Sequence, residues 1–160
     1  MGWSASGSGI FFFRAVARFP RVTQEPTGSI YAVHADGTHL RRVTPADLPV
    51  EVAGNAGGRV SADGSWIVFT SSGVIWKIRT DGLDLTKVHQ DPMGRLAITP
   101  AWSPDGRFII FGLDPAGSLA VTATTPANGL YVIRADGSGL TPVIVSSDWK
   151  REPDWVATKA

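Results

Sequence analysis

The stretch most informative about the fold reads Trp102-Ser103-Pro104-Asp105-Gly106-Arg107-Phe108-Ile109-Ile110-Phe111, and Leu130-Tyr131-Val132-Ile133-Arg134-Ala135-Asp136-Gly137 follows it. Asp-Gly between apolar runs signals a tight turn between antiparallel strands, because Gly adopts positive φ at no steric cost and Asp can bond its own backbone. The runs beside both turns are rich in β-branched and aromatic residues, as strands are. Two turns in one unit therefore predict four antiparallel strands between residues 100 and 143.

The same motifs recur in the same order elsewhere in the chain. A second copy spans residues 59–88, with Asp63-Gly64 and Asp81-Gly82 as its turns. A first copy spans about residues 1–44, and it is clear mainly in its second half, around Asp36-Gly37. Residues 152–156 read as the partial closing strand of a fourth copy. A period of about 45–55 residues with four strands per unit is typical of a β-propeller blade.

The predicted fold class is all-β: one propeller segment over residues 1–160, with about three blades of four antiparallel strands plus a partial one. A single four-stranded sheet cannot bury both faces, so neighbouring blades must stack against it. The recurrent aromatic residues are interpreted as this packing: Trp66, Phe69, Trp76, Trp102, Phe108, Phe111 and Tyr131. A β-sandwich also has short strands at regular spacing, but it would not explain why the motifs recur in one order.

The Trp-Ser-Pro-Asp-Gly motif at Trp102 and the later Ala-Asp-Gly at Ala135 resemble the WD-like repeat of TolB-like propellers. The same repeat occurs in the propeller domains of prolyl-oligopeptidase-type and tricorn-type proteases. The resemblance implies a ring of six or seven blades that binds partners at its axial faces. It also implies a periplasmic or extracellular place at the bacterial envelope, where TolB works with a peptidoglycan-associated lipoprotein.

About three blades are too few to close a ring, since propellers use typically four to eight. The ring is therefore incomplete, with missing blades expected upstream of Met1, or self-assembling, with a homodimer completing it. A remnant without independent function is a further alternative.

Composition and motifs argue against several classes of function. The net charge is +1, from 15 basic and 14 acidic residues, so the chain has no long-range electrostatic field that would steer nucleic acid toward it. There is no cysteine, and the apolar run at Ile10 is too short to span a bilayer. None of the histidines, His34, His39 and His89, has a second histidine or an acidic residue at the spacing of a metal site. The aspartates stand one per turn and are interpreted as turn formers. No nucleophile elbow or phosphate loop is found, so we predict no enzyme, cofactor, metal or catalytic residue.

Topology separates the turns from the longer connections. The Asp-Gly turns should share one end of the propeller, the tight-turn pole. The opposite end, the loop pole, should then carry the long connections 14–28, 45–58, 89–99, 112–128 and 145–152. Function usually sits on long loops of a rigid scaffold. Trp and Arg are frequent in binding hot spots, and the candidate partner-binding residues are Asp91, Met93, Arg95, Asp148, Trp149, Lys150 and Arg151.

The predicted function is therefore a protein–protein interaction scaffold that binds an unidentified protein partner through its loop pole. The alternative, from another class, is the propeller portion of a larger prolyl-oligopeptidase-like or tricorn-like hydrolase. That alternative needs a catalytic domain, which these 160 residues do not contain.

Overall fold

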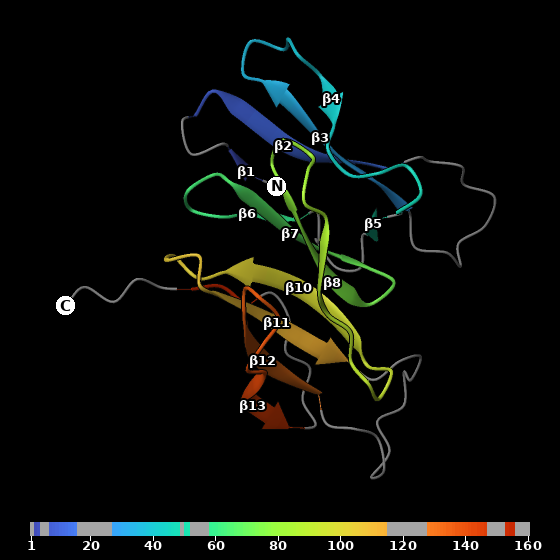
Figure 1. The fold of residues 1–160 in the computed structure, drawn as a ribbon, viewed down its shortest axis with the longest axis vertical. Helices are drawn as coiled ribbons and strands as arrows, with labels where there is room; N and C mark the ends of the chain where they lie inside the picture. The colour runs from blue at the N-terminus through green and yellow to red at the C-terminus, as the bar shows by residue number, and fades with distance from the viewer. Residues whose placement is uncertain are drawn as a thin grey trace.

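The computed structural model describes residues 2–3, 7–15, 27–48, 50–51, 58–114, 128–146 and 153–155. Within these ranges the chain forms strands and turns and no helix. Three antiparallel sheets follow one another along the long axis of the molecule (Figure 1). The predicted propeller blades are thus confirmed as the unit of the fold.

Blade 1 has the strand order β1-β2-β3-β4, with β1 Gly2–Trp3, β2 Gly9–Ala15, β3 Thr27–His34 and β4 Arg41–Arg42. A further short strand, β5 (Val50–Glu51), pairs with the start of β3 inside the predicted loop 45–58.

Blade 2 has the order β6-β7-β8-β9, with β6 Arg59–Val60, β7 Trp66–Ser71, β8 Val74–Arg79 and β9 Thr86–His89. Blade 3 has the order β10-β11-β12-β13, with β10 Leu96–Trp102, β11 Phe108–Asp114, β12 Asn128–Arg134 and β13 Thr141–Ser146.

The Ser-x-Asp-Gly turns are held by a small set of local hydrogen bonds. In blade 3, the Ser103 hydroxyl donates to Asp105 over 2.6 Å and accepts the backbone N–H of Phe108 over 2.9 Å. Gly106 follows with φ of 69°, a left-handed conformation that favours glycine. The hydrogen bond from Ser103 is the main reason that the pKa of Asp105 is lowered. Ser61 and Asp63 repeat this arrangement in blade 2.

The two Asp-Gly turns of blade 2 lie side by side at one edge of the sheet, and so do those of blade 3. The two turns are joined by backbone hydrogen bonds of 2.9 Å, from Thr80 to Ser65 in blade 2 and from Ala135 to Arg107 in blade 3. This places the Asp-Gly turns together at the tight-turn pole.

The core lies between blades. One cluster joins Phe11, Ile30, Ala32 and Val43 of blade 1 to Ile67, Phe69 and Ile78 of blade 2. A second joins Val68, Ile75 and Val88 of blade 2 to Ile109, Phe111, Tyr131 and Ile133 of blade 3, with Ala97, Trp102 and Leu113 beside them. Most of the predicted aromatic residues contribute, but Phe108 is only half-buried and Arg107 lies 5.8 Å from its ring centre.

One described part of the loop pole, the connection 89–99, contains more regular structure than the sequence indicates. Strand β10 begins at Leu96, inside the predicted connection 89–99, because Leu96 pairs with Asp114 of β11. Ala97 also donates a backbone hydrogen bond of 2.9 Å to Gly73. An irregularity between Ile98 and Ala101, where Thr99 has a φ of 47°, then shifts the register. Of the predicted closing strand 152–156, Pro153, Asp154 and Trp155 are described, and they are not in a strand.

Candidate functional site

The connection from β9 to β10 is a compact turn built around the Asp91 carboxylate. One carboxylate oxygen accepts the backbone N–H groups of Met93 over 3.0 Å and Arg95 over 3.2 Å. The other oxygen lies 2.7 Å from the Arg95 guanidinium. The Asp91 side chain is 0% exposed and that of Arg95 is 13% exposed, so the ion pair is shielded from water. A charge-assisted pair in such a place fixes the turn geometry.

Arg95 ties this turn to blade 3. Its second guanidinium nitrogen donates to the Tyr131 hydroxyl over 2.9 Å, and its carbon lies 5.2 Å from the Tyr131 ring centre. Tyr131 is a buried residue of β12 that stacks on Phe111 at 6.3 Å. One arginine therefore connects the turn between two blades to the aromatic core of the second.

The protonation states follow from this arrangement. Burial opposes the ionisation of Asp91, but hydrogen bonds from Arg95 and Met93 outweigh it, and the net effect lowers the pKa of Asp91. The hydrogen bond with Asp91 raises the pKa of Arg95. Nearby His89 packs at 5.4 Å from the Phe111 ring. Burial lowers the pKa of His89, against the opposing attraction of Asp91.

Two apolar side chains on and beside this turn face solvent. Met93, at the tip of the turn, is 68% exposed, and Leu96, the first residue of β10, is 41% exposed. Leu96 also lies directly over the Ser72-Gly73 turn, where a β-carbon on Gly73 would come within 2.5 Å of it. Exposed apolar groups on a held backbone suit a contact surface, because little backbone freedom is lost on binding.

The structure brings together only part of the predicted set of partner-binding residues. Asp91 and Arg95 lie side by side and form the internal frame of the turn. Asp148, Trp149, Lys150 and Arg151 lie outside the described residues. Sequence reasoning missed the part that Tyr131 plays, since its aromatic type indicated packing alone.

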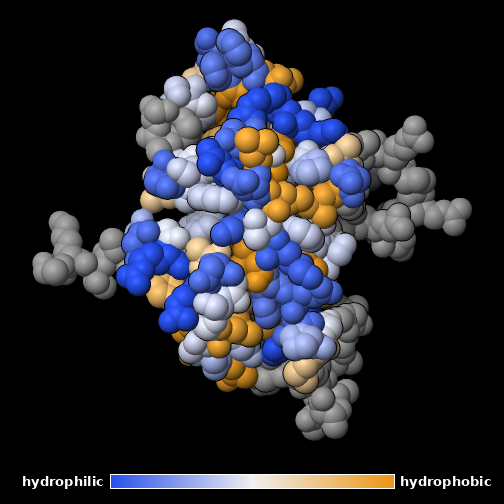
Figure 2. Space-filling view, viewed as in Figure 1, coloured by the Kyte–Doolittle hydropathy of each residue, from blue (hydrophilic) through white to orange (hydrophobic). Residues whose placement is uncertain are grey.

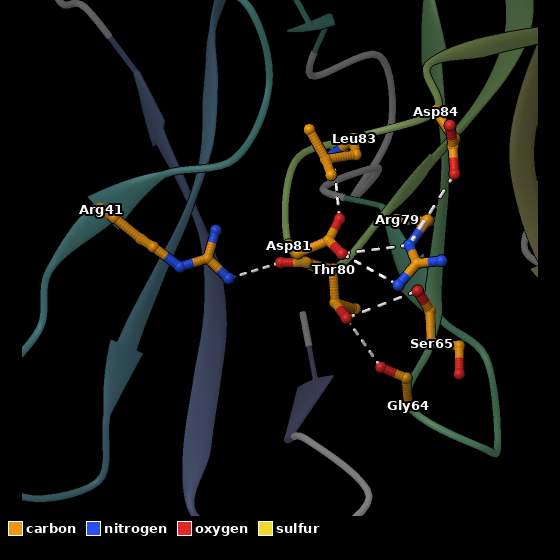
Figure 3. Close-up of polar contacts among 8 residues, drawn as sticks. All are labelled: Arg41, Gly64, Ser65, Arg79, Thr80, Asp81, Leu83 and Asp84. Atoms are coloured by element: carbon orange, nitrogen blue, oxygen red, sulfur yellow. Dashed lines mark hydrogen bonds and ion pairs between the residues drawn. The ribbon is translucent and has the colours of Figure 1, made fainter.

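The tight-turn pole carries a different, exposed network (Figure 3). Arg79 pairs with Asp81 at 3.0 Å and lies 3.9 Å from Asp84, and all three side chains are exposed. The backbone hydrogen bond from Leu83 is the main cause of the lowered pKa of Asp81. Exposed pairs of this kind contribute little, about 0–1 kcal/mol.

Two of the three histidines contact each other in the structure. His34 and His39 stack at 4.3 Å on the exposed turn of blade 1, where Thr38 bonds the His39 ring over 2.8 Å. In the part of the chain that the structure describes, no group of three or more His, Cys, Asp or Glu residues could hold a metal ion. The same part contains no helix of the length and apolarity that crossing a bilayer requires.

No family model and no curated protein matches the chain. Solved structures do match, and they include a TolB and propeller domains of peptidases, so the chain has a β-propeller fold. One match is a protein from Agrobacterium tumefaciens described as a TolB, with TM-score 0.65 and 21% identity over 89% of this chain and 47% of that one.

Two further matches are associated with enzymes. Oligogalacturonate lyase in complex with manganese has TM-score 0.67 and 14% identity over 92% of this chain and 39% of that one. The β-propeller domain of the Trilobed protease from Pyrococcus furiosus has TM-score 0.54 and 13% identity over 88% and 40%. The chain thus spans less than half the length of these three structures.

Proposed function

We propose that the chain is a protein–protein interaction scaffold that contacts its partner through the loop pole. The observation that carries this proposal is the turn 91–95, where a shielded Asp91–Arg95 ion pair holds the exposed Met93 in a fixed position. Binding energy usually concentrates in a few residues of an interface, and Met is among the residue types enriched there. Because the terminal guanidinium nitrogens of Arg95 bond Asp91 and Tyr131, the proposal gives these three residues a positioning role and gives Met93 and Leu96 the direct contact.

The proposal assigns no catalytic step to the described residues. Of the titratable groups beside the turn 91–95, His89 packs on the Phe111 ring and Asp91 is paired with Arg95. We propose that the scaffold works at the bacterial cell envelope, where a protein partner would meet the loop pole, and the likeness to a TolB supports this. That compartment is checked by fractionating cells that produce the chain and probing periplasmic and cytoplasmic extracts.

The contact is tested by site-specific photo-crosslinking in intact cells. A photoreactive residue replaces Met93 in one variant and Leu83 in the other. The two side chains are 68% and 64% exposed, but they lie at opposite poles, which makes Leu83 a matched control. We expect one defined protein adduct from position 93 and none from position 83. No adduct at position 93, or the same adducts from both positions, would refute the loop pole as the contact surface.

The second candidate, the propeller portion of a larger hydrolase, rests on the likeness to the propeller domain of the Trilobed protease. It predicts another outcome of the same experiment. The cross-link from position 93 would then join the propeller to a hydrolase domain, and mass spectrometry of the adduct would identify hydrolase peptides.

A further inference from the structure

Both junctions between consecutive blades use the same structural positions. Each blade presents a rear face to the next blade and a front face to the previous one. On the rear faces, Val43 of blade 1 and Val88 of blade 2 occupy the same place in the repeat. Val43 shares a buried cluster with Ile78 of blade 2, and Val88 shares one with Ile133 of blade 3. Ile78 and Ile133 are themselves equivalent, three residues before the aspartate of the second Asp-Gly turn.

Backbone contacts at the tight-turn pole repeat in the same way. A β-carbon on Gly82 would lie 3.2 Å from the carbonyl oxygen of Val43, and one on Gly137 would lie 2.7 Å from that of Val88. Each junction also has a cation from the preceding blade on a turn carbonyl. Arg41 donates to Thr80 (Figure 3), and Lys77 donates to Ala135 over 2.8 Å.

The rear face of blade 3 and the front face of blade 1 have the residues of this junction but no blade packed on them within the described residues. On the rear face of blade 3, Val143 is 53% exposed, whereas its counterparts Val43 and Val88 are 5% and 7% exposed. On the front face of blade 1, Val33 is half-buried, whereas Ile78 and Ile133 are buried. A β-carbon on Gly37, the counterpart of Gly82 and Gly137, would meet nothing within 4 Å.

Further apolar side chains lie on the same two end faces. Half-buried Ile10, Phe12 and Tyr31 share the front face of blade 1, and half-buried Ile110, Leu130 and Val132 share the rear face of blade 3. Figure 2 shows apolar surface at both ends of the stack of blades.

We propose that these two faces join in a homodimer, with the rear face of blade 3 of each copy packed on the front face of blade 1 of the other. The junction inside the chain is the template: Val143 of one copy would lie beside Val33 of the second copy, as Val43 lies in one cluster with Ile78. The carbonyl oxygen of Val143 would then approach Gly37 of the second copy.

A second copy is the occupant that the repeat favours, because both faces needed for the contact are on this chain. Two head-to-tail contacts related by a two-fold axis close without leaving an unpaired face. Three blades from each copy give a ring within the range of four to eight blades that propellers use. The inference does not depend on the proposed function, since it concerns the end faces and not the loop pole.

The experiment is light scattering on the purified chain at about 1 and 100 μM, a range that detects dimers of micromolar affinity. We expect twice the chain mass of 17.0 kDa at the higher concentration. A monomer at both concentrations overturns the proposal. A trimer or an open-ended series of larger species also overturns it, because the head-to-tail contact would not close at two copies.

Three variants test the faces. Val143→Asp and Val33→Lys are each expected to be monomeric, with circular dichroism unchanged. Leu83→Asp, at an exposed turn residue away from both faces, is the control and should remain dimeric. Mixing the two monomeric variants should restore the dimer, because each supplies the intact face that the other lacks. If the mixture stays monomeric while both variants are folded, the head-to-tail arrangement is wrong. If Val33→Lys does not fold, the mass of Val143→Asp alone decides.

Discussion

Replacing Arg95 with Met removes the central charge of the turn 91–95 while it keeps a side chain of similar length. Asp91 would lose its 2.7 Å ion pair and Tyr131 its 2.9 Å hydrogen bond. Breaking a buried ion pair from one side costs about 3–5 kcal/mol, because the remaining charge is left in a shielded place. Asp91 keeps its hydrogen bonds from the backbone of Met93 and of residue 95, so we expect the low end, about 3 kcal/mol.

The assay is urea unfolding followed by tryptophan fluorescence, at one fixed protein concentration because self-association would shift the midpoint. Arg79→Met is the matched control, since its ion pairs with Asp81 and Asp84 are exposed, and it should cost less than about 1 kcal/mol. The pair Asp91→Asn and Arg95→Met should show coupling well above about 0.5 kcal/mol in a double-mutant cycle.

A loss below about 1 kcal/mol for Arg95→Met, equal to that of the Arg79→Met control, would refute the reasoning. It would show that water reaches Asp91 and that the ion pair does not hold the turn. Additive effects of the two loop substitutions would lead to the same conclusion.

Three further predictions use the same unfolding measurement. Phe111→Ala, at a fully buried ring of the second core cluster, should cost about 3–5 kcal/mol, whereas Phe108→Ala at a half-buried ring should cost clearly less. Ser103→Ala removes the hydroxyl that bonds both Asp105 and the Phe108 backbone and should cost about 1–2 kcal/mol, with equal stability to wild type counting against this account of the turn. The pKa of His89 is lowered in the folded state, so the unfolded chain takes up a proton first, and stability should fall as pH drops below about 6.5. His89→Gln should remove this part of the pH dependence, and an unchanged slope in that variant would exclude His89 as its cause.

The blades were predictable because their signals are local. Each Asp-Gly turn and its flanking strands lie within a short window, and hydrogen bonds such as Ser103 to Asp105 span two residues. The order in which these motifs recur then indicated the propeller, and the likeness to solved propellers confirmed it.

The role of the loop residues was harder to predict from the sequence. Asp91 and Arg95 are the type of polar loop residues that bind partners, yet Arg95 turns inward to Tyr131, which is 36 positions further along the chain. Nothing near Arg95 in the sequence signals this contact, because it forms only when blade 3 stacks on blade 2. The stacking of His34 on His39 likewise depends on the path of the turn, where His39 has a φ of 57°.

The close approach of Gly82 to Val43 and of Gly137 to Val88 has a consequence for how such a molecule can change over generations. At these points one blade touches the next through main-chain atoms, and neither side depends on the identity of a side chain. A gene segment encoding one whole blade could therefore be duplicated or exchanged, as long as it keeps the turn glycine and the apolar side chains that face the neighbouring blades. A chain with residues 59–100 repeated in tandem would retain both halves of every internal contact, and its length could grow in whole blades.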